Sequence, residues 1–471
     1  MHIWIMIIYS SMIQLRNMEG YFYEKKSIAI IMMIMISVCV SIGAKAETAD
    51  TVNDLILEFK DKTSCDSVSV VVYEKGKASF YGDKDSLYQI GSMTKAFTGL
   101  AVEKMMIEGL LSKDDTVSDL IPGFEAFYDG KKADITVDDL MRQRSGFTNS
   151  EKDFPSATED MTLSEWVCSM SGKSIKSMPG SEYAYSNANY NILGAIIERV
   201  SGMTYPEYME NEILKPLGLN DTYVGYPSYS GNVIEGERLA YRNTFEYCIP
   251  VKKACIPAGY FYSDAKDMSS WIDIWTGTAE VSPPFRSAID NIKIRLADDT
   301  DYYSGWEKAD DMIGHSGGTP NYSSRIVFSD NDDIGVCVLT NLNVSASTDS
   351  LCNGIIDIVK GRDRGRISND VWTVFDIVFF AVTLLGIILF AAAFLMRKKH
   401  ILIFTAIVLA LLIFTMIILF PVIFSAPLRE ILFIWAPASL VGGMIMICAD
   451  IIHICIRLFL RKNNADSNKT G

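Results

Sequence analysis

Histidine is scarce in this chain, which has only four among 471 residues. His2, His400 and His453 lie in or beside strongly apolar segments, and this leaves His315 as the one histidine of the polar middle region. A catalytic zinc site usually takes two or three histidine ligands. The scarcity therefore argues against a histidine-based metal site, and we expect no metal and no organic cofactor.

Basic residues are outnumbered by acidic ones, with 43 Lys and Arg against 57 Asp and Glu and a formal net charge of −14. The acidic excess lies in the middle region. Binding to nucleic acid or to an anionic lipid surface depends on basic surface charge, so both are poor candidates as partners. No repeat and no linker rich in Pro, Gly or Ser divides this region, which predicts one large domain or two subdomains.

Apolar sequence is in excess, since 49% of the residues are hydrophobic and the mean hydropathy is +0.18. Four runs account for it: Ile28–Ile42, Val371–Met396, Ile401–Phe424 and Ile431–Ile456. The first run follows two lysines and precedes Ala44-Lys45-Ala46, a pattern typical of a signal peptide. We expect residues 1–46 to be a leader cleaved before Glu47, with an uncleaved signal anchor as the alternative.

Each of the three later runs is long enough to cross a membrane. The basic clusters at Arg397–Lys399 and after Arg457 fall on one side, which predicts a cytoplasmic tail at 457–471 and an extracytoplasmic domain at 47–365. The predicted spans are 371–396, 401–424 and 431–456. Asp450 and His453 share a helix face in the last span, where they are either a functional pair or residues that reach the headgroups.

Six cysteines lie in the predicted domain. Cys248 and Cys255 flank a short loop that contains a proline. A disulfide between them and free buried thiols are both compatible with this spacing.

Two serines are followed by a lysine three residues later, the S-x-x-K pattern: Ser92 with Lys95 and Ser263 with Lys266. Ser92 opens a stretch with apolar residues at helical spacing, so we expect it at a helix N-terminus with Lys95 one turn further on the same side. There the lysine amine can accept the serine proton, and the helix end favours the developing anion. Capping is the alternative role for such a serine, and it suits Ser263 better.

Two more motifs follow along the chain. Tyr185-Ser186-Asn187 comes after a Pro179-Gly180 turn, and His315-Ser316-Gly317-Gly318 precedes the strand-like segment Ser324–Thr340. A second Y-x-N, Tyr241-Arg242-Asn243, lacks the Pro-Gly turn, and we interpret it as a surface loop.

In the order S-x-x-K, Y-x-N, H-S-G, the chain resembles the serine β-lactamase and penicillin-binding-protein superfamily, in particular class C β-lactamases and their esterase and peptidase relatives. The resemblance covers approximately Val52–Val359. It also includes other segments that the family shares: Ile135–Met141 leading to Ser145-Gly146, Leu193-Gly194, Ser201–Met203, Pro216–Leu219 and Pro257-Ala258-Gly259.

The resemblance implies a mixed α/β (α+β) fold. An antiparallel sheet flanked by helices would be built from strands near both ends of the domain, including Ser67–Tyr73 and Ala78–Tyr81. A mainly helical subdomain would carry Tyr185, with the active site in the cleft between the two.

The resemblance also implies a serine hydrolase that acts on a small-molecule or peptide substrate, such as an ester, a D-amino peptide or a cell-wall peptide. Ser92 would be the acylated nucleophile, Lys95 its proton acceptor and Tyr185 the phenol that shuttles protons to the leaving group. Asn187 would hold a substrate amide and the Lys95 side chain. The residues of the third motif would bind substrate, and the backbone N–H groups of Ser92 and Gly318 would form the oxyanion hole, which needs two converging donors. That motif comprises His315, Ser316, Gly317 and Gly318.

Two departures from the family pattern bear on substrate choice. Gln143-Arg144-Ser145-Gly146 stands where relatives often have His-Thr-Ser-Gly, so we expect this loop to differ near the cleft. His315 stands where many relatives have the lysine of Lys-Thr-Gly. An unperturbed histidine is mostly neutral at pH 7, so discrimination in favour of substrate carboxylates should weaken and uncharged esters or amides should be used better than β-lactams.

Three alternatives remain for the function. Gly314–Gly318 matches the G-x-S-x-G nucleophile elbow of α/β-hydrolases, but no histidine of the domain follows Ser316, as the triad order would require. A catalytically silent module could bind a cell-wall peptide and act as a sensor or scaffold through the three spans. A true β-lactamase is the third alternative.

Overall fold

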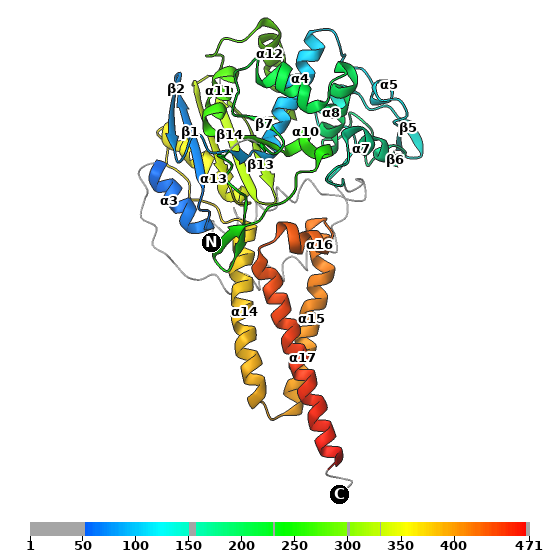
Figure 1. Ribbon diagram of the computed structural model, residues 1–471, viewed down its shortest axis with the longest axis vertical. Helices are drawn as coiled ribbons and strands as arrows, with labels where there is room; N and C mark the ends of the chain where they lie inside the picture. The colour runs from blue at the N-terminus through cyan, green and yellow to red at the C-terminus, as the bar shows by residue number, and fades with distance from the viewer. Residues whose placement is uncertain (1–51, 150–156, 229–230, 299–301, 330, 468–471) are drawn as a thin grey trace. The chain divides into compact units, whose positions relative to one another are not determined.

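A seven-stranded antiparallel sheet forms the centre of the region after the predicted leader (Figure 1). The computed structural model describes residues 52–149, 157–228, 231–298, 302–329 and 331–467, with the backbone alone for 462–467, so the leader lies outside the described residues. The strand order is β11-β12-β13-β14-β15-β1-β2. In chain order the strands are β1 (Val68–Glu74), β2 (Lys77–Tyr81), β11 (Tyr302–Tyr303), β12 (Trp306–Ala309), β13 (Met312–Thr319), β14 (Tyr322–Ser329) and β15 (Ile334–Thr340).

The predicted antiparallel sheet is confirmed, with strands from both ends of the domain side by side. β1 pairs with β15 from Val68↔Thr340 to Glu74↔Ile334. The segment expected as Ser324–Thr340 forms two strands, β14 and β15, which pair with each other.

Helices cover both faces of the sheet because side chains alternate between the faces along a strand. Val70 and Val72 belong to the core shared with α3 (Val52–Thr63) and α13 (Ser345–Val359). Val71 and Tyr73 belong to a larger core on the other face, shared with α11 (Ala265–Thr276) and the helical region. The sheet is therefore the middle layer of a three-layer domain.

The helical region lies between β2 and β11 in the sequence. Its remaining helices are α4 (Thr94–Ile107), α5 (Val117–Leu120), α6 (Val137–Met141), α7 (Leu163–Met170), α8 (Asn187–Ser201), α9 (Tyr205–Tyr208), α10 (Ile256–Gly259) and α12 (Pro283–Asp298). Its small sheets have the orders β3-β10-β7, β5-β4-β6 and β8-β9. Their strands are β3 (Tyr88–Gln89), β4 (Ala126–Tyr128), β5 (Lys131–Ala133), β6 (Lys173–Ser174), β7 (Tyr223–Val224), β8 (Glu237–Ala240), β9 (Asn243–Glu246) and β10 (Phe261–Ser263).

Four helices of this region begin after a threonine that is followed three residues later by an acid, and in three of them the two residues form a complete capping box. Thr136, Thr162 and Thr204 each accept a hydrogen bond from the backbone N–H of that acid, whose carboxylate bonds back to the N-cap. These capping boxes satisfy backbone donors that a helix start leaves free, and so they fix where α6, α7 and α9 begin.

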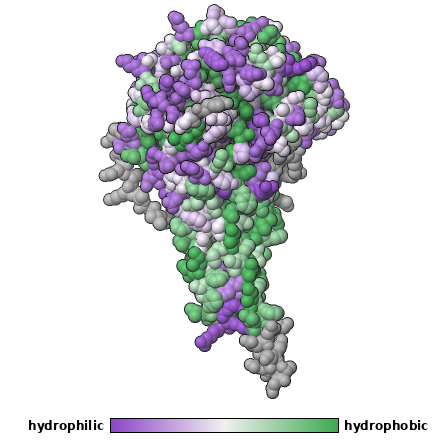
Figure 2. Space-filling model, viewed as in Figure 1, coloured by the Kyte–Doolittle hydropathy of each residue, from purple (hydrophilic) through white to green (hydrophobic). Residues whose placement is uncertain are grey.

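Three helices of the described residues are long and apolar enough to cross a membrane: α14 (Val371–Leu395), α15 (Lys399–Phe424) and α17 (Ala438–Ser467). Figure 2 shows apolar side chains over their outer surface and mostly hydrophilic ones over the domain. The third helix begins seven residues later than the expected Ile431, because a short π-helical turn, Ile431–Trp435, ends before Pro437, which has no N–H to continue it.

Asp450 and His453 are buried within this bundle. A Cβ on Gly386 of α14 would lie 3.2 Å from the Asp450 carboxylate. The His453 ring centroid is 4.3 Å from those of both Phe390 and Phe394.

Candidate active site

Ser92 lies at the start of a buried helix, as its sequence predicts. It is in a 3-10 turn, Gly91–Met93, that runs directly into α4, and Lys95 follows in the first turn of that helix. Lys95 is fully buried, and its Nζ lies 2.9 Å from Ser92 Oγ. Serine and lysine are therefore on the same side of the helix and in hydrogen-bond contact.

The Lys95 amine has two further partners, Asn187 Oδ1 at 2.8 Å and the Ala258 carbonyl at 2.5 Å. Burial holds the pKa of Lys95 well below its usual value. A neutral amine has two hydrogens and one lone pair. The hydrogens match the two oxygens, which leaves the lone pair for the Ser92 hydroxyl proton.

Tyr185 and Asn187 reach the same point from the start of α8. Asn187 is the first residue of that helix, and Tyr185 directly precedes the N-cap, Ser186. Lys95 Nζ lies 4.9 Å from the centroid of the Tyr185 ring. Burial raises the pKa of Tyr185, and its hydrogen bond with Ser92 only partly offsets this. The phenol is therefore neutral in the free protein and can donate a proton.

The loop that departs from the family pattern, residues 143–146, is hydrogen-bonded to the segment that follows Tyr185. Gln143 Oε1 accepts hydrogen bonds from the Ser186 N–H, at 2.9 Å, and from the Asn189 side chain. Ser145 Oγ lies 2.5 Å from Asn189 Oδ1. All three of these side chains are fully buried, namely those of Gln143, Ser145 and Asn189. This part of the loop therefore stabilises the start of α8.

His315 is buried on β13, and its ring is fully engaged. Nδ1 lies 2.6 Å from the Ser316 carbonyl and therefore carries the hydrogen, which leaves Nε2 to accept from the Tyr302 hydroxyl at 3.3 Å. Burial, reinforced by Lys95, lowers the pKa of His315 to about 3. The ordinary histidine pKa expected at this position is therefore wrong. The side chain is neutral because it is buried, and it has no free N–H for a substrate.

Sequence reasoning missed a charged network beside Ser316. Arg325 lies opposite Ser316 in the β13–β14 register, and its guanidinium donates to Ser316 Oγ at 2.7 Å. Ser316 Oγ donates in turn to Asp349 at 2.8 Å, and Glu307 lies 3.7 Å from Arg325. The available signal was Arg325 itself, the one charged residue in an otherwise uncharged strand.

Gly317 and Gly318 lie against the Ser92 turn. Gly91 has a left-handed φ of +53°, and a Cβ there would lie 2.5 Å from the Gly318 nitrogen. A Cβ on Gly317 would overlap the Ile90 carbonyl and the Ser324 hydroxyl. The segments that carry the Ser92 and Gly318 N–H groups are thus in van der Waals contact, as two converging donors require.

The rival motifs do not form sites. Ser263 is buried on β10 and bonds Thr222, while Lys266 pairs with Asp221 at the surface. The N-cap of α11 is Asp264 rather than the expected Ser263. Ser316 lies within an eight-residue strand, whereas a nucleophile elbow needs a sharp turn from strand to helix.

The described part of the chain offers neither a metal site nor a disulfide. It contains no group of three His, Cys, Asp or Glu side chains that could hold a metal ion. The described cysteines, Cys248 and Cys255 included, are free thiols.

The antiparallel sheet, the adjoining helical region and a helix-start serine next to a buried lysine define the β-lactamase and transpeptidase fold class. The Beta-lactamase family matches residues 52–359, and the chain belongs to this family of serine hydrolases.

Similar proteins fall into the same group. Protein flp of Staphylococcus aureus (strain NCTC 8325 / PS 47) is 28% identical over 386 residues, which covers 74% of this chain and 76% of that protein. A putative D-alanyl-D-alanine carboxypeptidase of Salmonella paratyphi B (strain ATCC BAA-1250 / SPB7) is 33% identical over 147 residues, 29% of this chain and 34% of that protein.

Solved structures show the same fold. The octameric penicillin-binding protein homologue from Pyrococcus abyssi has a TM-score of 0.57 at 22% identity, and covers 70% of this chain and 80% of its own. A class C β-lactamase from Rhodobacter sphaeroides has a TM-score of 0.54 at 20% identity, with 66% and 99% covered. At these identities the likeness shows the fold alone.

Proposed function

We propose that the protein is a membrane-anchored extracytoplasmic serine hydrolase that forms an acyl-enzyme on Ser92. The observation that carries the proposal is the contact of Ser92 Oγ with the Nζ of a fully buried Lys95. A surface helix cap would leave its lysine solvated and charged. A neutral lysine with its lone pair toward a serine hydroxyl is a general base.

The proposed reaction has two halves. Lys95 takes the Ser92 proton as Oγ attacks the acyl carbonyl, and the backbone N–H groups of Ser92 and Gly318 stabilise the oxyanion. The C–O or C–N bond then breaks, and the leaving group receives a proton through the neutral Tyr185 phenol. Water attacks the acyl-enzyme by the same route in reverse, which releases the acid and returns the proton to Ser92. Asn187 orients Lys95 and a substrate amide.

The charges beside the site favour uncharged esters and amides over carboxylate-bearing β-lactams. His315 is neutral, and the cation nearest to Ser316, Arg325, is matched by Glu307 and Asp349. A substrate carboxylate would therefore meet little net positive charge. The relatives support an acyl hydrolase, since one is named a putative D-alanyl-D-alanine carboxypeptidase, and we propose esters, D-amino peptides or cell-wall peptides as substrates.

The topology belongs to the same proposal. Three helices of membrane-spanning length follow the domain. The basic turn at Arg397–Lys399 and the residues after Arg457 would lie in the cytoplasm, which places the hydrolase domain on the outer side.

A fluorophosphonate, which phosphonylates activated serines, tests the proposal. The wild-type protein should be labelled, and Ser92→Ala should abolish the labelling. Ser263→Ala is the matched control, because it removes the serine of the other S-x-x-K pattern and should leave labelling intact. Labelling that persists in Ser92→Ala would refute the mechanism, and an unlabelled wild type would favour a silent sensor or scaffold.

A further inference from the structure

The hairpin of β8 and β9 projects from the domain onto the membrane bundle. Its two strands form a sheet of their own, which a single bridge between Glu237 and Leu342 joins to the segment after β15. Tyr241 and Arg242 form the turn with φ of +55° and +65°. Such a two-residue turn with both residues left-handed fits the twist of a hairpin. This is the second Y-x-N pattern. The sequence interpretation as a surface loop is wrong, because the turn is held by α14.

One carboxylate of the bundle bonds the backbone of this turn, beside a ring contact between Tyr241 and Phe380 of α14. Asp376 of α14 is fully buried, and it accepts hydrogen bonds from the backbone N–H groups of Tyr241, at 2.8 Å, and Arg242, at 2.6 Å. Ser439 of α17 donates a third at 2.7 Å. An acid within an apolar helix is costly unless its oxygens are bonded. Here two of the three donors come from the hydrolase domain, so Asp376 is the hydrogen-bond acceptor that binds the hairpin turn to α14.

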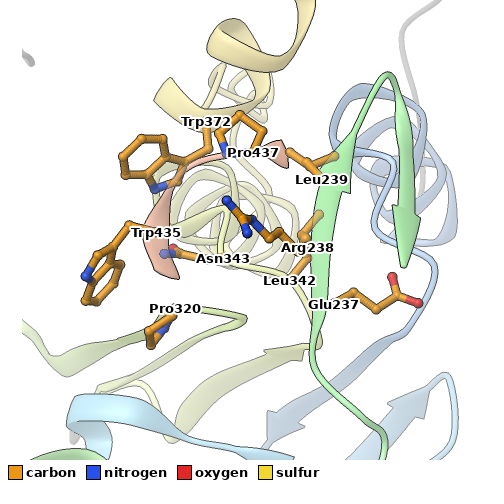
Figure 3. A pocket seen from close by; sticks show the side chains of 9 residues that line it. All are labelled: Glu237, Arg238, Leu239, Pro320, Leu342, Asn343, Trp372, Trp435 and Pro437. Atoms are coloured by element: carbon orange, nitrogen blue, oxygen red, sulfur yellow. The ribbon is translucent and has the colours of Figure 1, made fainter. Parts of the chain in front are cut away.

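A second contact, made by Arg238, binds strand β8 to the segment that precedes α17. Arg238 of β8 donates to the carbonyls of Ala436, at 2.7 Å, and Leu432, at 2.5 Å, where the π-helical turn ends. Figure 3 shows its side chain reaching from β8 toward Pro437 and Trp372. Carbonyls at a helix end lack backbone partners, so a guanidinium satisfies them well.

The base of the hairpin is bonded to the turn that follows the oxyanion strand. Asn321 lies between β13 and β14, three residues after Gly318, and its side chain donates to the Tyr247 carbonyl just after β9 at 2.6 Å. The neighbouring Tyr322 hydroxyl donates to the Ile234 carbonyl just before β8 at 2.9 Å. An unbroken series of hydrogen-bonded segments therefore joins Asp376 to the strand of Gly318.

We propose that the three-helix bundle regulates the hydrolase, because the β8–β9 hairpin couples the arrangement of α14 and α17 to the position of the oxyanion strand β13. The inference rests on the proposed function. A change in the packing of α14 against α17 moves Asp376 relative to Ser439. The hairpin turn moves together with Asp376, because it is hydrogen-bonded to that carboxylate. The Gly318 N–H then shifts relative to Ser92, which changes kcat more than KM, since an oxyanion donor acts in the transition state.

The test uses the full-length protein in phospholipid nanodiscs. Asp376→Ala removes the carboxylate that binds the hairpin turn, and Ser439→Ala removes one hydrogen bond to that carboxylate. Asp450→Asn is the matched control, because Asp450 is an equally buried acid of the same bundle, located at Gly386 and away from the hairpin. Each variant is assayed for kcat and KM on a neutral ester and for amide hydrogen exchange in residues 237–247 and 315–322.

Asp376→Ala should lower kcat by about threefold or more, within the usual range for mutations that couple distant sites. It should also speed exchange in both segments, while Asp450→Asn changes neither. Faster exchange in 237–247 with wild-type kcat and wild-type exchange in 315–322 would overturn the proposal. If Asp376→Ala does not fold, Ser439→Ala and Arg238→Gln should show the same changes in smaller degree, and their absence would overturn it equally.

Failure of the proposed function is distinguishable. It would show as a wild type with no esterase activity and no labelling of Ser92. The exchange measurement on residues 315–322 would still decide whether the bundle and β13 are coupled.

Discussion

Gly91 and Gly318 approach so closely that a Cβ on Gly91 would lie 2.5 Å from the Gly318 nitrogen. We predict that Gly91→Ala lowers the acylation rate by about 100-fold or more, the usual cost of losing one oxyanion donor. The added methyl group would push the Gly318 N–H away from the Ser92 turn. Stopped-flow acylation by a chromogenic ester measures this rate.

Gly109→Ala is the control for backbone strain in that experiment. Gly109 also has a left-handed φ, +72°, just after α4, but a Cβ there would meet nothing within 4 Å. It should cost about 1 kcal/mol of stability and leave the acylation rate unchanged. Equal losses of rate in both variants would mean that strain, not the position of Gly318, is responsible.

The pH dependence of kcat/KM should report the buried amine. Lys95 acts as a base only when neutral, and burial lowers its pKa well below the usual value. For a neutral ester, kcat/KM should therefore rise with pH through this lowered pKa and level off well below pH 10. Lys95→Arg, which stays charged, should abolish acylation. A rate that climbs until about pH 10.4, the value for a free lysine, would contradict the assignment.

The same pKa predicts how stability depends on pH. Between the lowered pKa and about 10.4, the unfolded chain binds a proton at Lys95 that the folded chain does not. Raising the pH in this range therefore favours the folded state. The Tm of the wild type minus that of Lys95→Met should become more positive between pH 7 and pH 9 in calorimetric scans. A constant difference between the two would show that Lys95 is charged in the folded protein.

Substrate preference should change when Arg325 loses a balancing acid. Glu307→Gln removes the carboxylate 3.7 Å from the guanidinium, so Asp349 is the one acid of this network left to balance Arg325 and a substrate carboxylate is repelled less. We predict that kcat/KM for a carboxylate-bearing ester rises about tenfold relative to that for its neutral analogue, roughly one charge-assisted hydrogen bond. Glu280→Gln, an exposed acid elsewhere, should leave the ratio as it is. An unchanged ratio in Glu307→Gln would exclude Arg325 from carboxylate selection.

Two exposed thiols give a test of topology. Cys168 and Cys248 lie on the surface of the domain. A membrane-impermeant maleimide should label both on intact cells. A Lys399→Cys variant, at the first residue of α15, should react only after permeabilisation. Labelling of Lys399→Cys on intact cells would reverse the proposed orientation.

The sheet was predictable because its signals are local. Ser67–Tyr73 and Ala78–Tyr81 are strands within one residue of the expected bounds, since the first is rich in valine and the second ends in two aromatic residues. The contact between Ser92 and Lys95 was predictable for the same reason, because helical spacing brings the two together.

The surroundings of His315 and the role of the hairpin could not be predicted, because both depend on contacts between distant segments. The Tyr302 hydroxyl accounts for one ring nitrogen of His315, and burial accounts for its low pKa. Neither can be inferred from a single histidine before a serine. The partner of the Tyr241 turn is Asp376, 135 residues further along the chain, and no local pattern links them.

The lowered pKa of Lys95 has its source in the exclusion of water rather than in a neighbouring cation. The side chains that enclose the amine are therefore necessary to favour its neutral form. A substitution that lets solvent reach Nζ would favour the protonated lysine. Ser92 would then lack a proton acceptor, although every residue of the proposed mechanism would still be present. Conversely, a desolvated base has little dependence on dissolved ions, so the acylation of a neutral ester should proceed at nearly the same rate in dilute buffer and in concentrated salt.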